Sequence, residues 1–150
     1  MLTEFVKLFF TRQPQKRFQI ECQLMLYFSG RNSMLRKKFQ RRIYYKYHCD
    51  ISHLAVIPKS TRFVHPIGVV IGSNAVLGDN VHIYQNVTLG SNFGNGNAMP
   101  KIGDGSIVSA GAKLIGGIDV GSNVIVGANS VITKDIPDDS VVVGSNRIIS

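Results

Sequence analysis

A histidine interrupts the most regular part of this 150-residue sequence. Apolar residues recur every six positions on both sides of the stretch TRFVHPIGVVIG, residues 61–72, but within it the spacing slips by two at His65-Pro66. Histidine ordinarily gains and loses a proton near neutral pH, so an accessible imidazole can act as a general base. A structural histidine at a bend is the alternative. The slip makes His65 the first candidate for chemistry.

The six-residue period predicts the fold that would carry this histidine. From residue 102 the chain reads IGDGSI, VSAGAK, LIGGID, VGSNVI, VGANSV and ITKDIP, and the same phase covers residues 71–88. An aliphatic residue every six positions puts one inward-facing side chain on each short strand, and three hexads make a triangular coil of about 18 residues. Glycine, which often stands second in a hexad, can take the positive φ of a sharp turn. We expect a mainly β fold, a hexapeptide-repeat solenoid over 50–150, because a β-sandwich would need a different spacing.

The period breaks a second time in the Gly- and Asn-rich stretch GSNFGNGNAMPK, residues 90–101. Hexads begin at residues 89 and 102, which are thirteen positions apart rather than the twelve of two whole hexads. Gly, Asn and Pro favour loops, and loops on a rigid scaffold often carry functional residues. We therefore expect a loop over 90–101 that leaves the coil and contributes to the functional site.

Residues 1–49 lack the period and are expected to form a short basic helical segment. Residues 1–50 hold eleven Lys and Arg against three acidic residues, a net charge of +8, whereas residues 51–150 hold six of each sign. Residues 33–48 have the spacing of a basic amphipathic helix, whose apolar stripe would pack on the solenoid end or on a neighbouring subunit. Contact of 31–48 with an anionic membrane or another polyanion is the alternative. Nucleic acid is not expected, because no recognisable binding module is present.

The composition is that of a globular protein, with 44% hydrophobic and 17% charged residues. No apolar run approaches the ~20 residues of a membrane span, and no signal-peptide pattern is seen. Two cysteines suggest neither a metal cluster nor a disulfide framework. We expect one cytoplasmic chain with free thiols and no metal, at most peripheral at the inner face of the membrane.

Over about residues 50–148, the sequence resembles the catalytic half of the serine acetyltransferase group of hexapeptide-repeat acyltransferases. The matching stretches include DISHLAVIPKSTRFVHPIGVVIGSN, PKIGDGSIVSAGAKLIGGIDVGSN and VIVGANSVITKDIP. The resemblance implies a left-handed parallel β-helix, a homotrimer, and active sites between adjacent subunits. It also implies that His65 is the general base and that Asp50, fifteen residues earlier, orients it. A carboxylate has the same role in the Ser-His-Asp arrangement.

The resemblance further implies acetyl-CoA as the acetyl donor. In the stretches SAGAKLIGG and VGANSVITKDIP, small residues would let the pantetheine arm lie close to the backbone, and a lysine would meet a phosphate as a point charge. The candidate donor-binding residues are Ser109, Ala110, Gly111, Ala112, Gly127, Ala128 and Lys134.

Two positions depart from the pattern of the amino-acid acetyltransferases in this group. They carry an aspartate directly before the catalytic histidine, where this chain has Val64, and a second histidine before PKI, where it has Met99. Both groups mainly recognise the amino acid, so we expect a sugar hydroxyl as acceptor, in a bacterial capsular polysaccharide, an exopolysaccharide or a precursor. Serine with an altered pocket is the alternative, and a non-catalytic trimeric scaffold is an alternative of another class. The candidate acceptor-binding residues are Val64, Gln85, Asn86, Asn97 and Met99.

Overall fold

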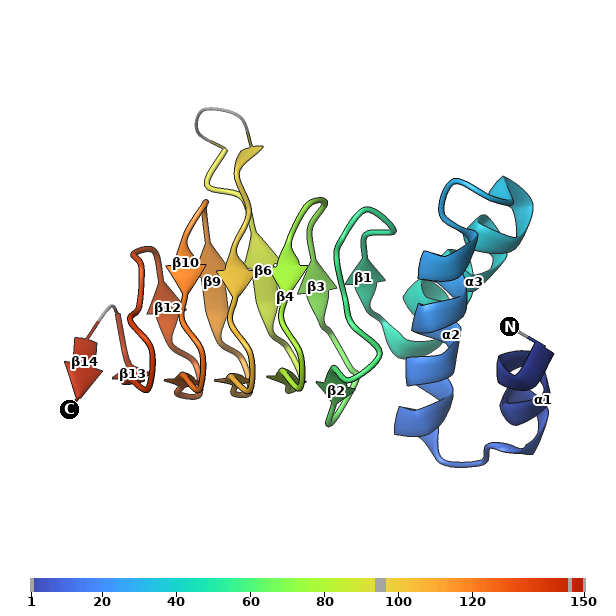
Figure 1. Cartoon of the computed structure of the whole chain (residues 1–150), viewed down its shortest axis with the longest axis horizontal. Coiled ribbons are helices and arrows are strands. Elements are labelled where there is room, and N and C mark those ends of the chain that lie inside the picture. Colours follow the sequence, from blue (N-terminus) through green and yellow to red (C-terminus); the bar gives the residue numbers. More distant parts are fainter. Residues whose placement is uncertain (1, 94–96, 146, 150) are drawn as a thin grey trace.

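The computed structural model describes residues 2–93, 97–145 and 147–149, which form three helices followed by a triangular β-helix (Figure 1). The helices are α1 (Leu2–Phe10), α2 (Pro14–Phe28) and α3 (Ser33–Tyr47). The short strands are β1 (Asp50–Ile51), β2 (Arg62–Phe63), β3 (Val70–Ile71), β4 (Val76–Leu77), β5 (His82–Ile83), β6 (Thr88–Gly90), β7 (Lys101–Ile102), β8 (Ile107–Val108), β9 (Lys113–Ile115), β10 (Asp119–Val120), β11 (Ile125–Val126), β12 (Val131–Ile132), β13 (Val141–Val143) and β14 (Arg147–Ile149). Within these described ranges, every helix is too short or too polar to cross a membrane.

The strands alternate among three sheets that form the sides of a prism. The five-stranded sheet has the order β1-β3-β6-β9-β12, the three-stranded sheet β4-β7-β10, and the six-stranded sheet β2-β5-β8-β11-β13-β14. Neighbouring strands are parallel except for the antiparallel pair β13-β14. Val70 pairs with Thr88 and Lys101 with Asp119, eighteen residues apart in both cases. The predicted coil of three hexads is confirmed.

A column of aliphatic side chains fills the prism. In the five-stranded sheet Ile71, Leu89, Leu114 and Ile132, each the first residue of a hexad, are fully buried one above the next. The strand residue before each of them points outward, so each strand buries one side chain and exposes its neighbour. Burial of such a side chain contributes roughly 1.5–3 kcal/mol, so the repeated aliphatic residue is what makes coils of two- and three-residue strands stable.

The turns of the prism use asparagine where we expected glycine. Asn74, Asn80 and Asn86, each fourth in its hexad, have φ of 67°, 57° and 57°, in the left-handed region that asparagine tolerates. The second-place glycines do not have positive φ, so that expectation was wrong. Glycine is needed there for space: a Cβ on Gly103 would lie 2.5 Å from the carbonyl carbon of Gly121 in the next coil.

Two coils are longer than eighteen residues. Asp50 pairs with Val70, twenty residues away, so two additional residues lie in the turn that contains His65. Val76 pairs with Lys101, twenty-five residues away, so seven additional residues lie between β6 and β7. The described part of this loop stands out from the prism (Figure 1), and residues 94–96 of the expected loop 90–101 lie outside the described residues. We expected one additional residue in this loop, counted against two whole hexads. That expectation was wrong, because β7 is the next strand after β6 and the regular spacing between successive strands is one hexad of six residues.

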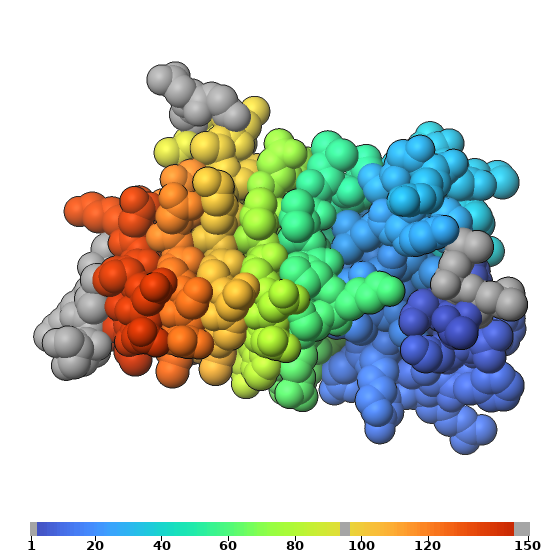
Figure 2. Space-filling model, in the orientation of Figure 1, coloured from blue at the N-terminus to red at the C-terminus, as the bar shows by residue number. Residues whose placement is uncertain are grey.

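The helical segment covers one end of the prism, at its first coil (Figure 2). Phe18 of α2 contacts Phe63 of β2 and Tyr47 of α3 edge to face, with ring centroids 4.9 and 5.1 Å apart. Gln23 Nε2 donates a hydrogen bond of 3.4 Å to the carbonyl oxygen of Ile57 in the first coil. These contacts fix the position of α2 relative to the turn that carries His65.

We predict that Gly103→Ala destabilises the β-helix. The new methyl group would overlap the backbone of Gly121, which cannot move without breaking the ladder between coils. Overpacking of this kind typically costs about 1–3 kcal/mol, so the thermal unfolding midpoint should fall. Gly90→Ala is the matched control, because its methyl group would meet only side-chain atoms, at 3.4 Å or more. Equal midpoints for the two variants would contradict the tight stacking of the coils.

Candidate active site

Two edges of the prism carry the candidate residues. The histidine edge joins the six-stranded sheet to the five-stranded sheet through the turns 64–69, 84–87, 109–112 and 127–130. The loop edge joins the five-stranded sheet to the three-stranded sheet through residues 72–75, 91–93 with 97–100, 116–118 and 133–135. Because the coils are stacked, residues at the same place in successive turns are neighbours.

The histidine edge brings together most of the residues expected from the sequence. Its turns are joined by backbone hydrogen bonds, for example from Asn86 N to Ile67 O and from Gly111 N to Gln85 O, both 2.9 Å. The candidate residues on this edge are Val64, His65, Gln85, Asn86, Ser109, Ala110, Gly111, Ala112, Gly127 and Ala128.

His65 lies in the first turn of this edge, where the two additional residues enlarge the coil. Pro66 is buried, and Ile67 N donates a 2.8 Å hydrogen bond to the carbonyl oxygen of His65, so the backbone of the turn is anchored. The imidazole itself is exposed and lies edge to face with Tyr84 of the next turn, with ring centroids 6.3 Å apart. The turn therefore presents an accessible imidazole from a fixed backbone.

Asp50 begins β1, one coil away from the turn of His65. Its backbone N donates a 2.9 Å hydrogen bond to Val69 O, and its carboxylate is exposed. No hydrogen bond or ion pair joins Asp50 to His65 in the described parts of the chain. The carboxylate instead lines a shallow pocket of ≈ 370 Å³ with Arg36 and Arg41 of α3. The pairing of Asp50 with His65 stays a prediction.

The donor-binding candidates differ in what they expose. Ser109, Ala110 and Gly127 are half-buried and Ala128 is exposed, whereas Ala112 is fully buried in the core. Gly111, with φ of 73°, packs under Asn129 of the next coil, and its contact with the donor stays a prediction. An adjoining turn holds the buried Gln85 Oε1, which has no hydrogen-bond partner among the residues that the structure describes. An orphaned acceptor beside small residues fits the amide N–H groups of a pantetheine arm.

Three other candidates lie on the loop edge, across the five-stranded sheet from His65. Asn97 is exposed with φ of 50°, and Lys134 is exposed in the turn after β12. Met99 is half-buried, and its sulfur lies 2.8 Å from where a Cβ of Gly72 would be, so it packs against the core. A single chain does not bring these three residues to His65.

The sequence did not reveal a groove of ≈ 510 Å³ that His65 and Val64 line together with the first turns of α2. Val64 is half-buried and its backbone N donates a 2.9 Å hydrogen bond to Ile83 O. The glutamines of QPQKRFQ, residues 13–19, are the only sequence signal for this wall of the groove. These glutamines lie beside His65 only because α2 docks on the first coil. No local sequence pattern predicts that docking.

The two cysteines do not take part in this edge. Burial, and to a lesser extent Cys49, raises the pKa of the Cys22 thiol to about 12. Burial also raises the pKa of Cys49. Thiolates are the reactive form of cysteine, so neither side chain suits nucleophilic catalysis near neutral pH.

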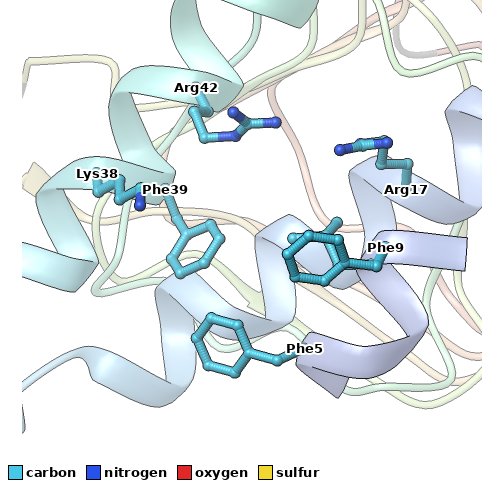
Figure 3. A pocket seen from close by; sticks show the side chains of 7 residues that line it. Phe5, Phe9, Arg17, Lys38, Phe39 and Arg42 are labelled. Carbon is cyan, nitrogen blue, oxygen red and sulfur yellow. The ribbon is translucent and has the colours of Figure 1, made fainter. Parts of the chain in front are cut away.

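A second cavity, of ≈ 310 Å³, lies among the three helices (Figure 3). Its lining is almost entirely apolar and includes the rings of Phe5, Phe9 and Phe39. Arg17, Lys38 and Arg42 lie along one side of these rings in Figure 3. The basic composition of the helical segment did not predict that its cations border an apolar cavity.

Comparison with known protein families matches residues 99–134 to the family described as Bacterial transferase hexapeptide (six repeats). A serine acetyltransferase of Bacillus pumilus (strain SAFR-032) is 34% identical over 161 residues, which cover 96% of this chain and 73% of that protein. A serine acetyltransferase of Staphylococcus aureus (strain Mu50 / ATCC 700699) is 48% identical over 91 residues, which cover 60% of this chain and 43% of that protein.

A solved structure described as "Serine Acetyltransferase- Complex with CoA" superposes on this chain with a TM-score of 0.81 at 31% identity. The match covers 89% of this chain and 56% of that one, so the chain spans about half the length of several relatives. The fold expected from the resemblance, a left-handed parallel β-helix with a short N-terminal helical segment, is confirmed.

We predict that iodoacetamide does not label the native chain at pH 8. The raised pKa of Cys22 and of Cys49 suppresses the thiolate, and both side chains are buried. After unfolding in urea, both thiols should react at the rate of free cysteine, as mass spectrometry can follow. Labelling of the native chain at the unfolded rate would contradict the burial of the two thiols.

Proposed function

Because the chain belongs to the serine acetyltransferase family of hexapeptide-repeat acyltransferases, we propose that it transfers an acetyl group from acetyl-CoA to a hydroxyl group. One observation carries this proposal: two additional residues hold His65 outside an otherwise regular coil, at the head of an edge built from small residues. A non-catalytic scaffold would not need an exposed imidazole at this place.

In the proposed step, His65 acts on the acceptor as a general base. Acetyl-CoA supplies the acetyl group as a thioester. An imidazole nitrogen of His65 takes the proton of the acceptor hydroxyl while that oxygen bonds to the acetyl carbon, and the proton then passes to the departing sulfur. Asp50 would orient the ring and stabilise its charged form, although the two side chains are not hydrogen-bonded in the free chain. Catalytic hydrogen bonds are often looser before substrate binds.

The donor would lie along the histidine edge. Ser109, Ala110 and Ala128 leave room beside the backbone for the pantetheine arm. Gln85 Oε1, buried and without a partner, supports this placement because it can accept a hydrogen bond from an amide of that arm. A surface that holds acetyl-CoA in this way positions the thioester carbon close to His65. Such positioning is the main contribution of the surface to the rate of transfer.

We place the complete site between subunits of a homotrimer. The loop-edge candidates Asn97, Met99 and Lys134 do not reach His65 within one chain. A neighbouring chain that turns its loop edge toward this histidine edge would bring the two sets together. The separation of the candidates in one chain supports such an arrangement.

Serine is the acceptor that the relatives favour. Both relatives named above are called serine acetyltransferases, and this supports serine more strongly than the sugar hydroxyl expected from Val64 and Met99. The sugar hydroxyl remains a second candidate for one structural reason. Val64 is apolar and Met99 packs against Gly72, so neither provides the charged group expected to recognise an amino acid.

We predict that His65→Ala lowers kcat for acetyl transfer by about 10²–10⁴, the usual contribution of a general base. Asp50→Asn should lower kcat as well, because the carboxylate no longer orients the ring. Thiol release from acetyl-CoA, measured with serine and with a panel of sugars, reports the rate. CoA affinity and the thermal unfolding midpoint should stay unchanged. His48→Asn, at an exposed position beyond α3, is the control, and a fully active His65→Ala would remove this residue from the mechanism.

A separate proposal concerns the helical segment, which we assign to an anionic membrane surface on the cytoplasmic side. Val6, Phe9 and Phe10 of α1 are 51%, 85% and 81% exposed, and the neighbouring cavity is bordered by Lys38 and Arg42 of α3. Exposed aromatic side chains beside cations suit the interface of an anionic bilayer. The contact would involve α1 as well as the basic residues 31–48.

The double variant Phe9→Ser, Phe10→Ser is predicted to weaken binding to phosphatidylglycerol-containing vesicles by at least tenfold. The wild-type chain should bind these vesicles at low salt, bind less as salt rises, and bind phosphatidylcholine vesicles poorly. Leu54→Ser, at a residue that is 53% exposed on the β-helix, is the matched control in the same sedimentation assay. No binding at low salt would reject the membrane contact.

A further inference from the structure

The groove beside His65 has polar walls that the acetyl-transfer step itself does not require. It measures ≈ 510 Å³ and lies between the first turns of α2 and residues 59–65 of the first coil. Its polar lining includes three amides and three cations, namely Gln13, Gln15, Gln19, Lys16, Lys59 and Arg62.

The groove is held open by the docking of α2 rather than by a mobile loop. Phe18 packs edge to face on Phe63, at 4.9 Å and 71°, and directs the neighbouring polar side chains of α2 along the coil. Gln15 and Gln19 are four residues apart and therefore share one face of the helix. One wall is the start of α2, and the other is β2 with the turns on either side of it, so the groove is part of the fold.

Two buried polar atoms of the groove lack a hydrogen-bond partner among the described residues. These atoms are Gln19 Nε2, a donor, and Thr61 Oγ1, in a side chain that is only 2% exposed. Buried polar groups in native proteins are nearly always hydrogen-bonded, so each orphan indicates that something polar belongs beside it. Their position points to an occupant that both accepts and donates hydrogen bonds.

The charges of the groove indicate the sign of that occupant. Lys16, Lys59 and Arg62 are exposed, and none of them forms an ion pair with a residue that the structure describes. No carboxylate lines the groove. Free serine carries an ammonium group as well as a carboxylate and has no net charge, whereas an acceptor with a net negative charge would be attracted to these cations.

We propose that this groove is an acceptor subsite and that it takes a polyhydroxylated acceptor with a carboxylate or phosphate group, such as an acidic sugar. This inference rests on the proposed acetyl transfer. Arg62 and Lys16 bind the anionic group, Gln19 and Thr61 bind hydroxyl groups, and a further hydroxyl lies at His65. Amides, hydroxyls and cations on a preformed surface are the side chains that such recognition requires.

The test compares acceptors with the full-length protein. Thiol release from acetyl-CoA is measured with D-glucuronate, glucose 1-phosphate, glucose and L-serine. We expect kcat/KM for at least one anionic sugar to exceed that for glucose by about tenfold, because hydrogen bonds to charged groups contribute this much. Comparison of the carboxylate with the phosphate identifies which anion the groove prefers.

Substitutions of groove residues then test whether the preference for an anionic sugar arises in the groove. Arg62→Gln and Lys16→Gln should raise KM for the preferred anionic sugar about tenfold and leave KM for acetyl-CoA unchanged. Gln19→Leu should raise KM for glucose as well. Arg12→Gln is the matched control, since this exposed arginine precedes α2 and does not line the groove.

Three results would overturn the inference. Serine could be the best acceptor, with a rate that no groove variant changes; the acetyl transfer would then stand without this subsite. The cation variants could raise KM for acetyl-CoA, which would assign the groove to the phosphates of the donor. If no acceptor is acetylated, the proposed function fails, and NMR titration with D-glucuronate still decides whether the groove binds: unchanged spectra, or equal affinity in Arg62→Gln, reject it.

Discussion

The ladder of backbone hydrogen bonds between successive coils is the constraint on which the rest of this structure depends. Strands of two or three residues keep their place only because each coil is bonded to its neighbours and shares one aliphatic column. An additional residue inside a strand would turn its inward side chains outward, so additional residues are tolerated only in turns. Both longer coils obey this rule, with two residues added at His65 and seven between β6 and β7.

This constraint concentrates chemistry at the edges of the prism. His65 can leave the coil because its turn is long, while the buried Pro66 keeps the turn attached. Regular turns of the same edge carry small residues, which we propose let a long flexible donor approach the backbone. The helical segment adds what the solenoid lacks, because the docking of Phe18 on Phe63 places a polar helix face beside His65. The regular coils thus fix the backbone in space, and the candidate functional residues lie where the chain departs from the repeat.

The period of six was sufficient to predict a solenoid of three-hexad coils, because one buried aliphatic residue for each strand is a local requirement that the sequence displays directly; its left-handedness came from the family resemblance. The conformation of the turns was predicted incorrectly: the left-handed residues are fourth in the hexad, Asn74 and its equivalents together with Gly105 and Gly111, while glycine in the second place allows close contact between coils. The slip at His65 located a candidate site. The packing of Met99 on Gly72 and the groove against Gln19 were not predictable, since both depend on contacts between segments far apart in sequence.

The central claim is that the enlarged turn exists to bring His65 to the thioester of the donor. A crystal structure of the assembled protein with CoA tests it most directly. We expect a pantetheine arm along the histidine edge, with the CoA sulfur within about 3–4 Å of the imidazole of His65, as a reactive geometry requires. A CoA molecule whose sulfur lies far from every His65 of the assembly would contradict it.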